Sequence, residues 1–119
     1  MKFKVDIWLR GNNHATTEQL ALASREPEAW TDEDVVLVLR EMLGALSRAK
    51  DPTEDVDRQI KLRGFSWIVN SYDSGGVVIA IELTLGAVVA GPFDIGDNKL
   101  TAMIKRAIET DKIESQSVH

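Results

Sequence analysis

The stretch FSWIVNSYDSGGVVIAIEL, residues 65–83, decides the fold of this chain. It contains two runs rich in β-branched and aromatic residues, separated by residues that favour turns. A three-residue loop at Asp73-Ser74-Gly75, with Tyr72 opposite Gly76, determines which side chains share a face. One face of this hairpin is apolar, with three opposed pairs: Phe65 with Leu83, Trp67 with Ile81, and Val69 with Ile79. The other face is mostly polar, so the sequence predicts an antiparallel hairpin with one buried side.

The loop sequence Asp73-Ser74-Gly75-Gly76 also occurs around the nucleophilic serine of chymotrypsin-like proteases, and His14 precedes it in the chain. Those enzymes are built from two β-barrels and are larger than one small domain. Their histidine motif does not occur around His14. A turn accounts for the same residues, because Gly75 suits the left-handed position of the loop and Asp73 favours its start. We therefore interpret Ser74 as a turn residue.

Outside the hairpin, residues 2–10 alternate between apolar and polar side chains, which is typical of a half-buried strand. Thr16 and Gln19 match a helix N-terminus, so we expect a short helix there that stops before Pro27. We interpret Gly86 as a bulge or bend, after which residues 87–90 continue the second arm of the hairpin.

Two amphipathic helices are predicted. The stronger one begins after Thr31, which can cap it, and ends by Lys50 because Pro52 disfavours a helical residue before it. Its apolar face has helical spacing and consists of Val35, Val38, Leu39, Met42, Leu43 and Leu46. The second helix follows Asp97, with Leu100, Met103, Ile104, Ala107 and Ile108 on one face.

These elements predict an α+β fold with an antiparallel sheet of three or four strands and two main amphipathic helices on one face. Residues 1–110 are expected to form a single domain, and the polar residues 111–119 a flexible C-terminal tail. The chain of 119 residues is long enough for one core without disulfides.

The composition excludes several kinds of chemistry. The chain has no cysteine, which excludes disulfides, thiolate catalysis, zinc–cysteine sites and iron–sulfur clusters. No signal peptide and no membrane-spanning run are visible, so we expect a cytoplasmic protein of bacterial or phage type that does not interact with membranes. No phosphate-binding, dinucleotide-binding or metal-binding motif occurs, and we expect no cofactor and no metal.

The net charge of −5 is unevenly distributed, since residues 26–57 hold ten acidic and three basic residues. An acidic chain repels phosphate backbones, so we expect no nucleic-acid partner. The predicted acidic surface consists of Asp32, Glu33, Asp34, Asp55 and Asp57. It either steers a basic protein partner or is a solvated helix surface, and a further alternative is that it mimics nucleic acid.

The outer face of the predicted sheet gives the leading functional hypothesis. It carries Trp8, Ile68, Tyr72, Val78 and Val88, and apolar groups with a polar rim are common at interfaces. We therefore expect a small, acidic, non-enzymatic protein-interaction domain that forms a homodimer or binds a protein partner, as inhibitors, immunity-type proteins and phage-encoded binders do. Exposed apolar residues scattered singly are also normal, which is the alternative explanation.

A second hypothesis concerns the loop after the first strand. Asn12, Asn13 and His14 could line a small polar pocket, which would make the chain a ligand-binding or catalytic domain. His119 is the last residue and has no predicted role, and no nucleophile with a partner base is recognisable. The sequence therefore gives no catalytic residue, and the alternative to the loop as a site is a plain surface turn.

Overall fold

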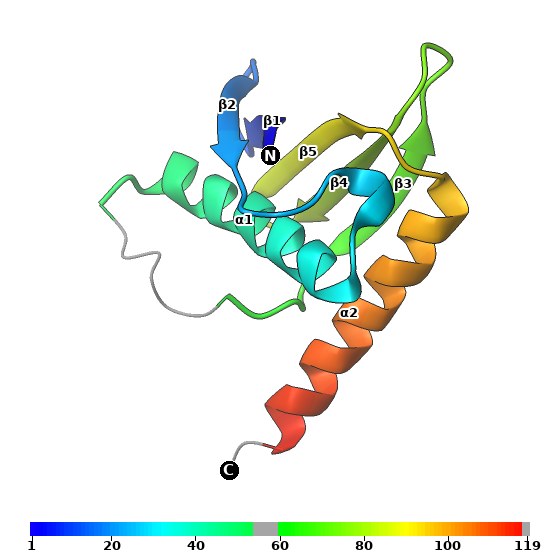
Figure 1. Ribbon diagram of the computed structural model, residues 1–119. Helices are drawn as coiled ribbons and strands as arrows, with labels where there is room; N and C mark the ends of the chain where they lie inside the picture. The colour runs from blue at the N-terminus through cyan, green and yellow to red at the C-terminus, as the bar shows by residue number, and fades with distance from the viewer. Residues whose placement is uncertain (54–59, 118–119) are drawn as a thin grey trace.

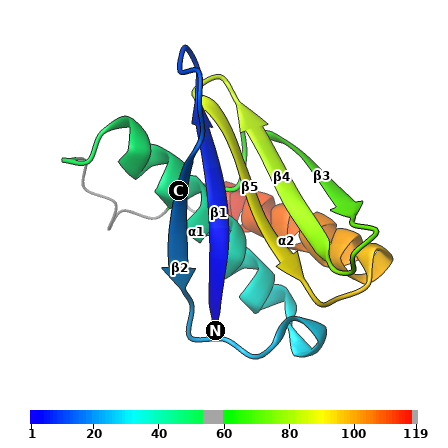
Figure 2. The same ribbon diagram turned by 90° about the horizontal axis from the view of Figure 1, so that it is seen from above.

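The computed structural model describes residues 1–53 and 60–117. It shows a five-stranded antiparallel sheet with two long helices against one face (Figure 1), and the view from above has both helices behind the sheet (Figure 2). The elements are β1 (Lys2–Leu9), β2 (Thr16–Ala21), the 3-10 helix η1 (Pro27–Ala29), α1 (Asp32–Lys50), β3 (Ser66–Ser71), β4 (Val77–Leu83), β5 (Gly86–Phe93) and α2 (Asp97–Ser117). The strand order is β2-β1-β5-β4-β3. The α+β class is confirmed, with five strands where three or four are predicted.

The hairpin of β3 and β4 has the predicted register. Trp67 lies opposite Ile81 and Val69 opposite Ile79, on the face that the helices cover. The Tyr72 N–H donates to the Gly76 carbonyl across the loop, at 3.0 Å between nitrogen and oxygen. Gly75 has a φ of 102°, a backbone conformation that side chains disfavour. The turn interpretation of this loop is therefore confirmed.

The strand β5 is separate from the second hairpin arm, and the expectation for Gly86 is wrong. β4 ends at Leu83, the chain reverses at residues 84–85, and Gly86 pairs back with Leu83. This reversal changes the face that each later residue occupies. Val88 consequently lies opposite Ile81 and is fully buried in the core, not on the outer face as predicted.

Residues 16–21 form the strand β2, and the helix predicted to start at Thr16 is also wrong. β2 forms an antiparallel hairpin with β1, in which Leu20 lies opposite Phe3 and both side chains are buried. The capping pattern is a local signal, whereas pairing with β1 adds backbone hydrogen bonds and buries Leu20. The β-branched side chains of Thr16 and Thr17 also suit a strand.

The helix α1 forms as predicted, because its N-terminus is capped and its apolar face is continuous. The Thr31 hydroxyl accepts from the Asp34 N–H, and the Asp34 carboxylate accepts from the Thr31 N–H. This reciprocal pair satisfies two backbone donors that the first turn leaves without partners. The helix ends at Lys50, also as predicted.

The core lies between the helices and the inner face of the sheet. α1 packs across β1 and β5, and α2 packs against α1 and β3. The Trp30 and Phe93 rings meet edge to face with 4.9 Å between centroids, and Phe3 lies 5.5 Å from the same Phe93 ring. The largest fully buried side chains include Leu39, Met42, Leu46, Ile79, Ile81, Leu100 and Ile104.

The helix α2 continues to Ser117, past residue 110, where the sequence predicts the start of a tail. Asp111, the first residue of the predicted tail, is only 6% exposed. Its carboxylate accepts from Arg40 Nη2 at 3.0 Å and from the Leu62 N–H at 2.9 Å. Arg40 Nε also donates to the Ile60 carbonyl. These bonds join α2, α1 and the segment that leads into β3.

Candidate functional site

The outer face of the sheet, opposite the helices, is the candidate site. Strand residues alternate between two faces, so Phe3, Val5 and Ile7 of β1 point into the core while Lys4, Asp6 and Trp8 point outward. The pairing register aligns the outward residues of neighbouring strands. One row runs Thr17, Asp6, Val89, Ala80 and Ile68, and the next runs Trp8, Ala87, Glu82 and Ser66. No helix of the described residues crosses this face (Figure 2).

Large apolar side chains stand at both sides of this face. Five large apolar side chains of the described residues are exposed, and three of them are here: Trp8 at 41%, Ile68 at 55% and Tyr72 at 49%. Trp8 lies on β1, whereas Ile68 and Tyr72 lie on or beside β3. The outward residues between them, on β4 and β5, include Ala80, Ala87 and Val89. The outer face therefore has small apolar residues and the exposed Glu82 at its centre and larger apolar residues at its sides.

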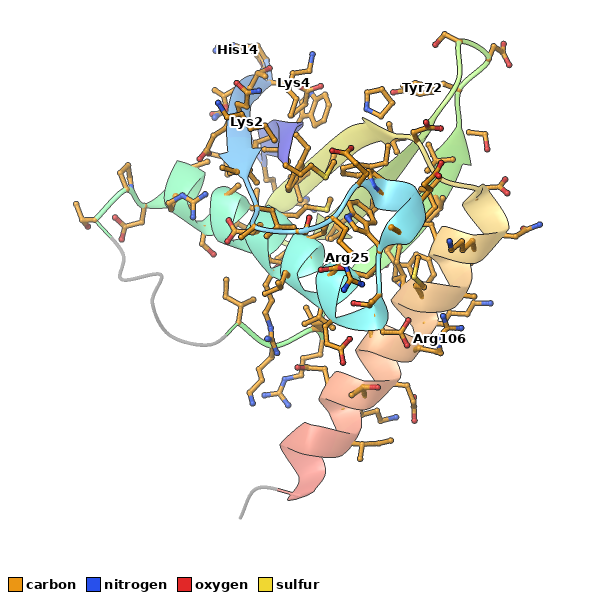
Figure 3. The ribbon with its side chains drawn as sticks, viewed as in Figure 1. Lys2, Lys4, His14, Arg25, Tyr72 and Arg106 are labelled. Carbon is orange, nitrogen blue, oxygen red and sulfur yellow. The ribbon has the colours of Figure 1, made fainter. Side chains whose placement is uncertain are left out.

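Charged groups border the apolar part of the face. Lys2 and Lys4 are exposed on β1, and Asp6 lies between them and Trp8 in the outward alternation. Lys4 and Tyr72 lie on the sheet side of the molecule, and Arg106 lies on the helix side (Figure 3). Asp6 accepts a hydrogen bond from the Thr17 hydroxyl at 2.7 Å. The outer face thus has cations at the start of β1 and carboxylates at Asp6 and at the exposed Glu82 of β4.

Two members of the predicted interaction face are not accessible. Val88 belongs to the core, as described above. Val78 faces outward by alternation with Val77 and Ile79, yet it is only 5% exposed. A bulge between β4 and β5 lies at this point, where Gly91 approaches the Val78 backbone closely. Trp8, Ile68 and Tyr72 are the predicted face residues that the structure brings to the surface.

The predicted ligand loop lies at the end of the β1–β2 hairpin. Asn12, Asn13 and His14 are all exposed, and the Asn12 N–H donates to the Leu9 carbonyl within the turn. His14 lies at the tip of the hairpin, away from the helices (Figure 3). Within residues 1–53 and 60–117, no three histidine or carboxylate side chains come close enough to hold a metal ion.

The predicted acidic surface is partly engaged in structural contacts. Asp32 accepts two hydrogen bonds from Arg106 on α2, at 2.9 and 3.1 Å, and the bond to Asp32 raises the pKa of Arg106. Asp34 serves in the helix cap, and Glu33 is exposed beside it. Asp55 and Asp57 lie outside the described residues. All the described members lie on the helix side, away from the outer face.

Sequence reasoning missed the buried role of Asp111, although a signal for it exists. Position 111 continues the apolar stripe of α2 that includes Leu100, Ile104 and Ala107, so it points toward the core. A carboxylate at such a position needs hydrogen-bond donors to be buried. Arg40 and the Leu62 N–H provide them, and neither can be assigned to Asp111 from spacing alone.

Among the helices of the described residues, none is long and apolar enough to cross a membrane.

Comparisons of the chain with protein-family models, with curated proteins and with solved structures find no match.

Proposed function

We propose that this chain is a small, non-enzymatic protein-interaction domain and that its outer sheet face is the contact surface. One observation supports the proposal: the uncovered face carries Trp8, Ile68 and Tyr72 as exposed side chains. Aromatic and large apolar residues with a polar margin are typical of interface centres. Leaving three such groups in water has a free-energy cost that burial against a partner would remove.

The outer face is large enough for a specific contact. Five strands about 4.8 Å apart, each with about six residues rising about 3.3 Å, cover about 480 Å². Two such surfaces bury roughly 1,000 Å² in total, which is the lower bound for a specific interface. We expect a reversible contact of moderate affinity, not an obligate assembly.

The charges of the face define the partner's chemistry. Lys2 and Lys4 lie at one end of β1, and the carboxylates of Asp6 and Glu82 lie among the outward residues of β1 and β4. A complementary surface has an apolar patch with carboxylates opposite the two lysines and cations opposite Asp6 and Glu82, because opposite charges steer association and select the partner. The acidic groups Asp32 and Asp34 face the helix side, where they are bound to Arg106 and to the helix cap.

Trp8 is the residue at which this proposal can be tested. A photoreactive phenylalanine analogue placed at position 8, in the cells that make the protein, should form a crosslink to the partner. In a titration with that partner after purification, Trp8→Asp should raise the dissociation constant at least about tenfold, since buried aromatic anchors dominate interface energies. Leu37→Asp is the matched control, because Leu37 on α1 is 42% exposed and Trp8 is 41% exposed.

Two outcomes contradict the proposal. One is that Trp8→Asp and Leu37→Asp bind equally well. The other is that the photoreactive analogue forms crosslinks at position 37 and not at position 8. Circular dichroism of both variants shows whether they fold, and we expect that they do because both side chains are already exposed.

A further inference from the structure

The edge strand β3 lacks the features that keep natural sheet edges from pairing. Its sequence, Ser-Trp-Ile-Val-Asn-Ser, contains no charged residue and no proline, and its register with β4 is regular. Sheet edges are commonly protected by lysine, proline, a bulge or an inward-pointing charge. The opposite edge, β2, has such a charge: Glu18 lies on the inner face and binds Arg48 at 3.1 Å. The two edges of this sheet therefore differ in protection.

The outward side of β3 presents backbone donors and acceptors. The Tyr72 N–H points toward β4, where it donates to Gly76. Backbone groups alternate in direction along a strand, so those of Ile68 and Asn70 also point toward β4. Those of Trp67, Val69 and Ser71 point away from it. Within residues 1–53 and 60–117, the structure records no hydrogen bond to these three outward sites.

We propose that two copies of this chain dimerise by pairing their β3 strands antiparallel, with Ile68 on the two-fold axis. Two identical edges are complementary in this arrangement, because each outward N–H meets an outward carbonyl of the other copy. Trp67 of each copy forms hydrogen bonds with the partner's Val69. The two sheets become one continuous sheet across the dimer.

The register about Ile68 is the one that the side chains favour. It places two Ile68 side chains directly opposite one another on the outer face, at a non-hydrogen-bonded position where side chains approach most closely. Ile68 is the most exposed of the large apolar groups of the sheet, at 55%. The pairing therefore removes from water the apolar side chain that the monomer leaves most accessible.

Charge complementarity supports the same register. Arg63, five positions before Ile68, and Asp73, five positions after it, are both exposed. Arg63 precedes β3 and Asp73 follows it in the loop to β4, so antiparallel pairing about Ile68 places Arg63 of one copy at the same end of the paired strands as the partner's Asp73. A slip of the register in either direction separates the two Ile68 side chains.

This inference shares Ile68 with the proposed contact face, but the two proposals are tested at different residues. It concerns the β3 edge, whereas the partner contact is tested at Trp8 on β1, three strands away in the sheet order. Dimerisation leaves Trp8 accessible, so one dimer can present two outer faces side by side. Failure of the Trp8 test leaves the edge proposal intact, and failure at the edge leaves the contact at Trp8 intact.

Placing a positive or a negative charge at position 68 tests the pairing of the two β3 strands. The full chain should show a dimer mass in size-exclusion light scattering at high concentration. Ile68→Lys and Ile68→Glu should each weaken dimerisation at least about tenfold, because the two-fold axis sets like charges directly opposite one another. An equimolar mixture of the two variants should regain the dimer, since lysine then lies opposite glutamate. Leu37→Lys adds the same charge on α1 and should leave the dimer unchanged.

Amide hydrogen exchange gives a second test that needs no variant. Raising the protein concentration should slow exchange at the N–H groups of Trp67, Val69 and Ser71, while Ile68 and Asn70 are protected at every concentration. The proposal is overturned if the chain stays monomeric, if both charged variants dimerise normally, or if their mixture stays monomeric. It is also overturned if concentration does not change exchange along β3.

Discussion

Gly86→Ala is expected to lower the free energy of unfolding by about 4 kcal/mol, from crowding of about 1–3 kcal/mol and backbone strain of similar size. A Cβ atom at position 86 would lie 2.1 Å from the Trp8 carbonyl oxygen and 3.0 Å from the Leu9 Cα. Neither atom belongs to a flexible side chain, so β1 and β5 would have to separate. A domain of this size has about 5–15 kcal/mol of total stability, so the variant should lose roughly a quarter to four fifths of it.

Gly75→Ala is the matched control for this prediction. Gly75 also has a positive φ, at 102°, but no atom within 4 Å of the added methyl group. It should lose about 1–2 kcal/mol from backbone strain alone. Urea unfolding followed by circular dichroism measures both variants. Equal losses at the two positions would contradict the close approach of β1 to Gly86.

Asp111→Ala should lower the free energy of unfolding by about 3 kcal/mol, at the lower end of the range for breaking a buried ion pair. The variant leaves the Leu62 N–H without an acceptor and Arg40 without its counter-ion. The lower end is expected because Arg40 keeps a quarter of its side-chain surface in water. The loss should appear as a lower urea midpoint.

Arg106→Ala removes an exposed ion pair, and its urea midpoint is the comparison for that of Asp111→Ala. Arg106 and Asp32 form an ion pair between α2 and α1, but the side chains are 57% and 44% exposed. Pairs in such positions contribute little because water screens both charges. The urea midpoint of Arg106→Ala should stay close to that of the unchanged chain. If Asp111→Ala behaves in the same way, the buried contact does not hold α2 to the segment before β3.

Local signals accounted for the parts of the fold that were predicted correctly. The β3–β4 register follows from the three-residue loop, since a two- or four-residue loop mixes polar residues into the apolar face. The helix α1 follows from the Thr31 cap and an unbroken apolar stripe. In both cases residues close in sequence carry all the necessary information, so no knowledge of other elements is needed.

The parts predicted wrongly depend on contacts between distant segments. β2 forms because β1 offers it a partner, and β5 is enclosed between β1 and β4. Around Gly86, the local sequence does not distinguish a two-residue reversal of the chain from a bend within one strand. The two alternatives place Val88 on opposite faces of the sheet. Asp111 likewise finds Arg40, 71 positions away in the chain.

The candidate site was predictable to a similar extent. Alternation within β1 and β3 was sufficient to place Trp8 and Ile68 on an outward face. The position of β1 beside β5, which brings these residues onto one surface, has no signature in either strand. The neighbours Ala80, Ala87 and Val89 could be named only once the strand order was known.

The three tryptophans lie in three different environments, so their fluorescence can report on three different parts of the chain. Trp30 is buried against Phe93, Trp67 is half-buried on the edge strand, and Trp8 is exposed. Indole fluorescence shifts to shorter wavelength when water leaves the ring. Chains that keep one tryptophan each, with phenylalanine at the other two positions, would report separately on unfolding through Trp30, on the β3 edge through Trp67, and on the outer face through Trp8.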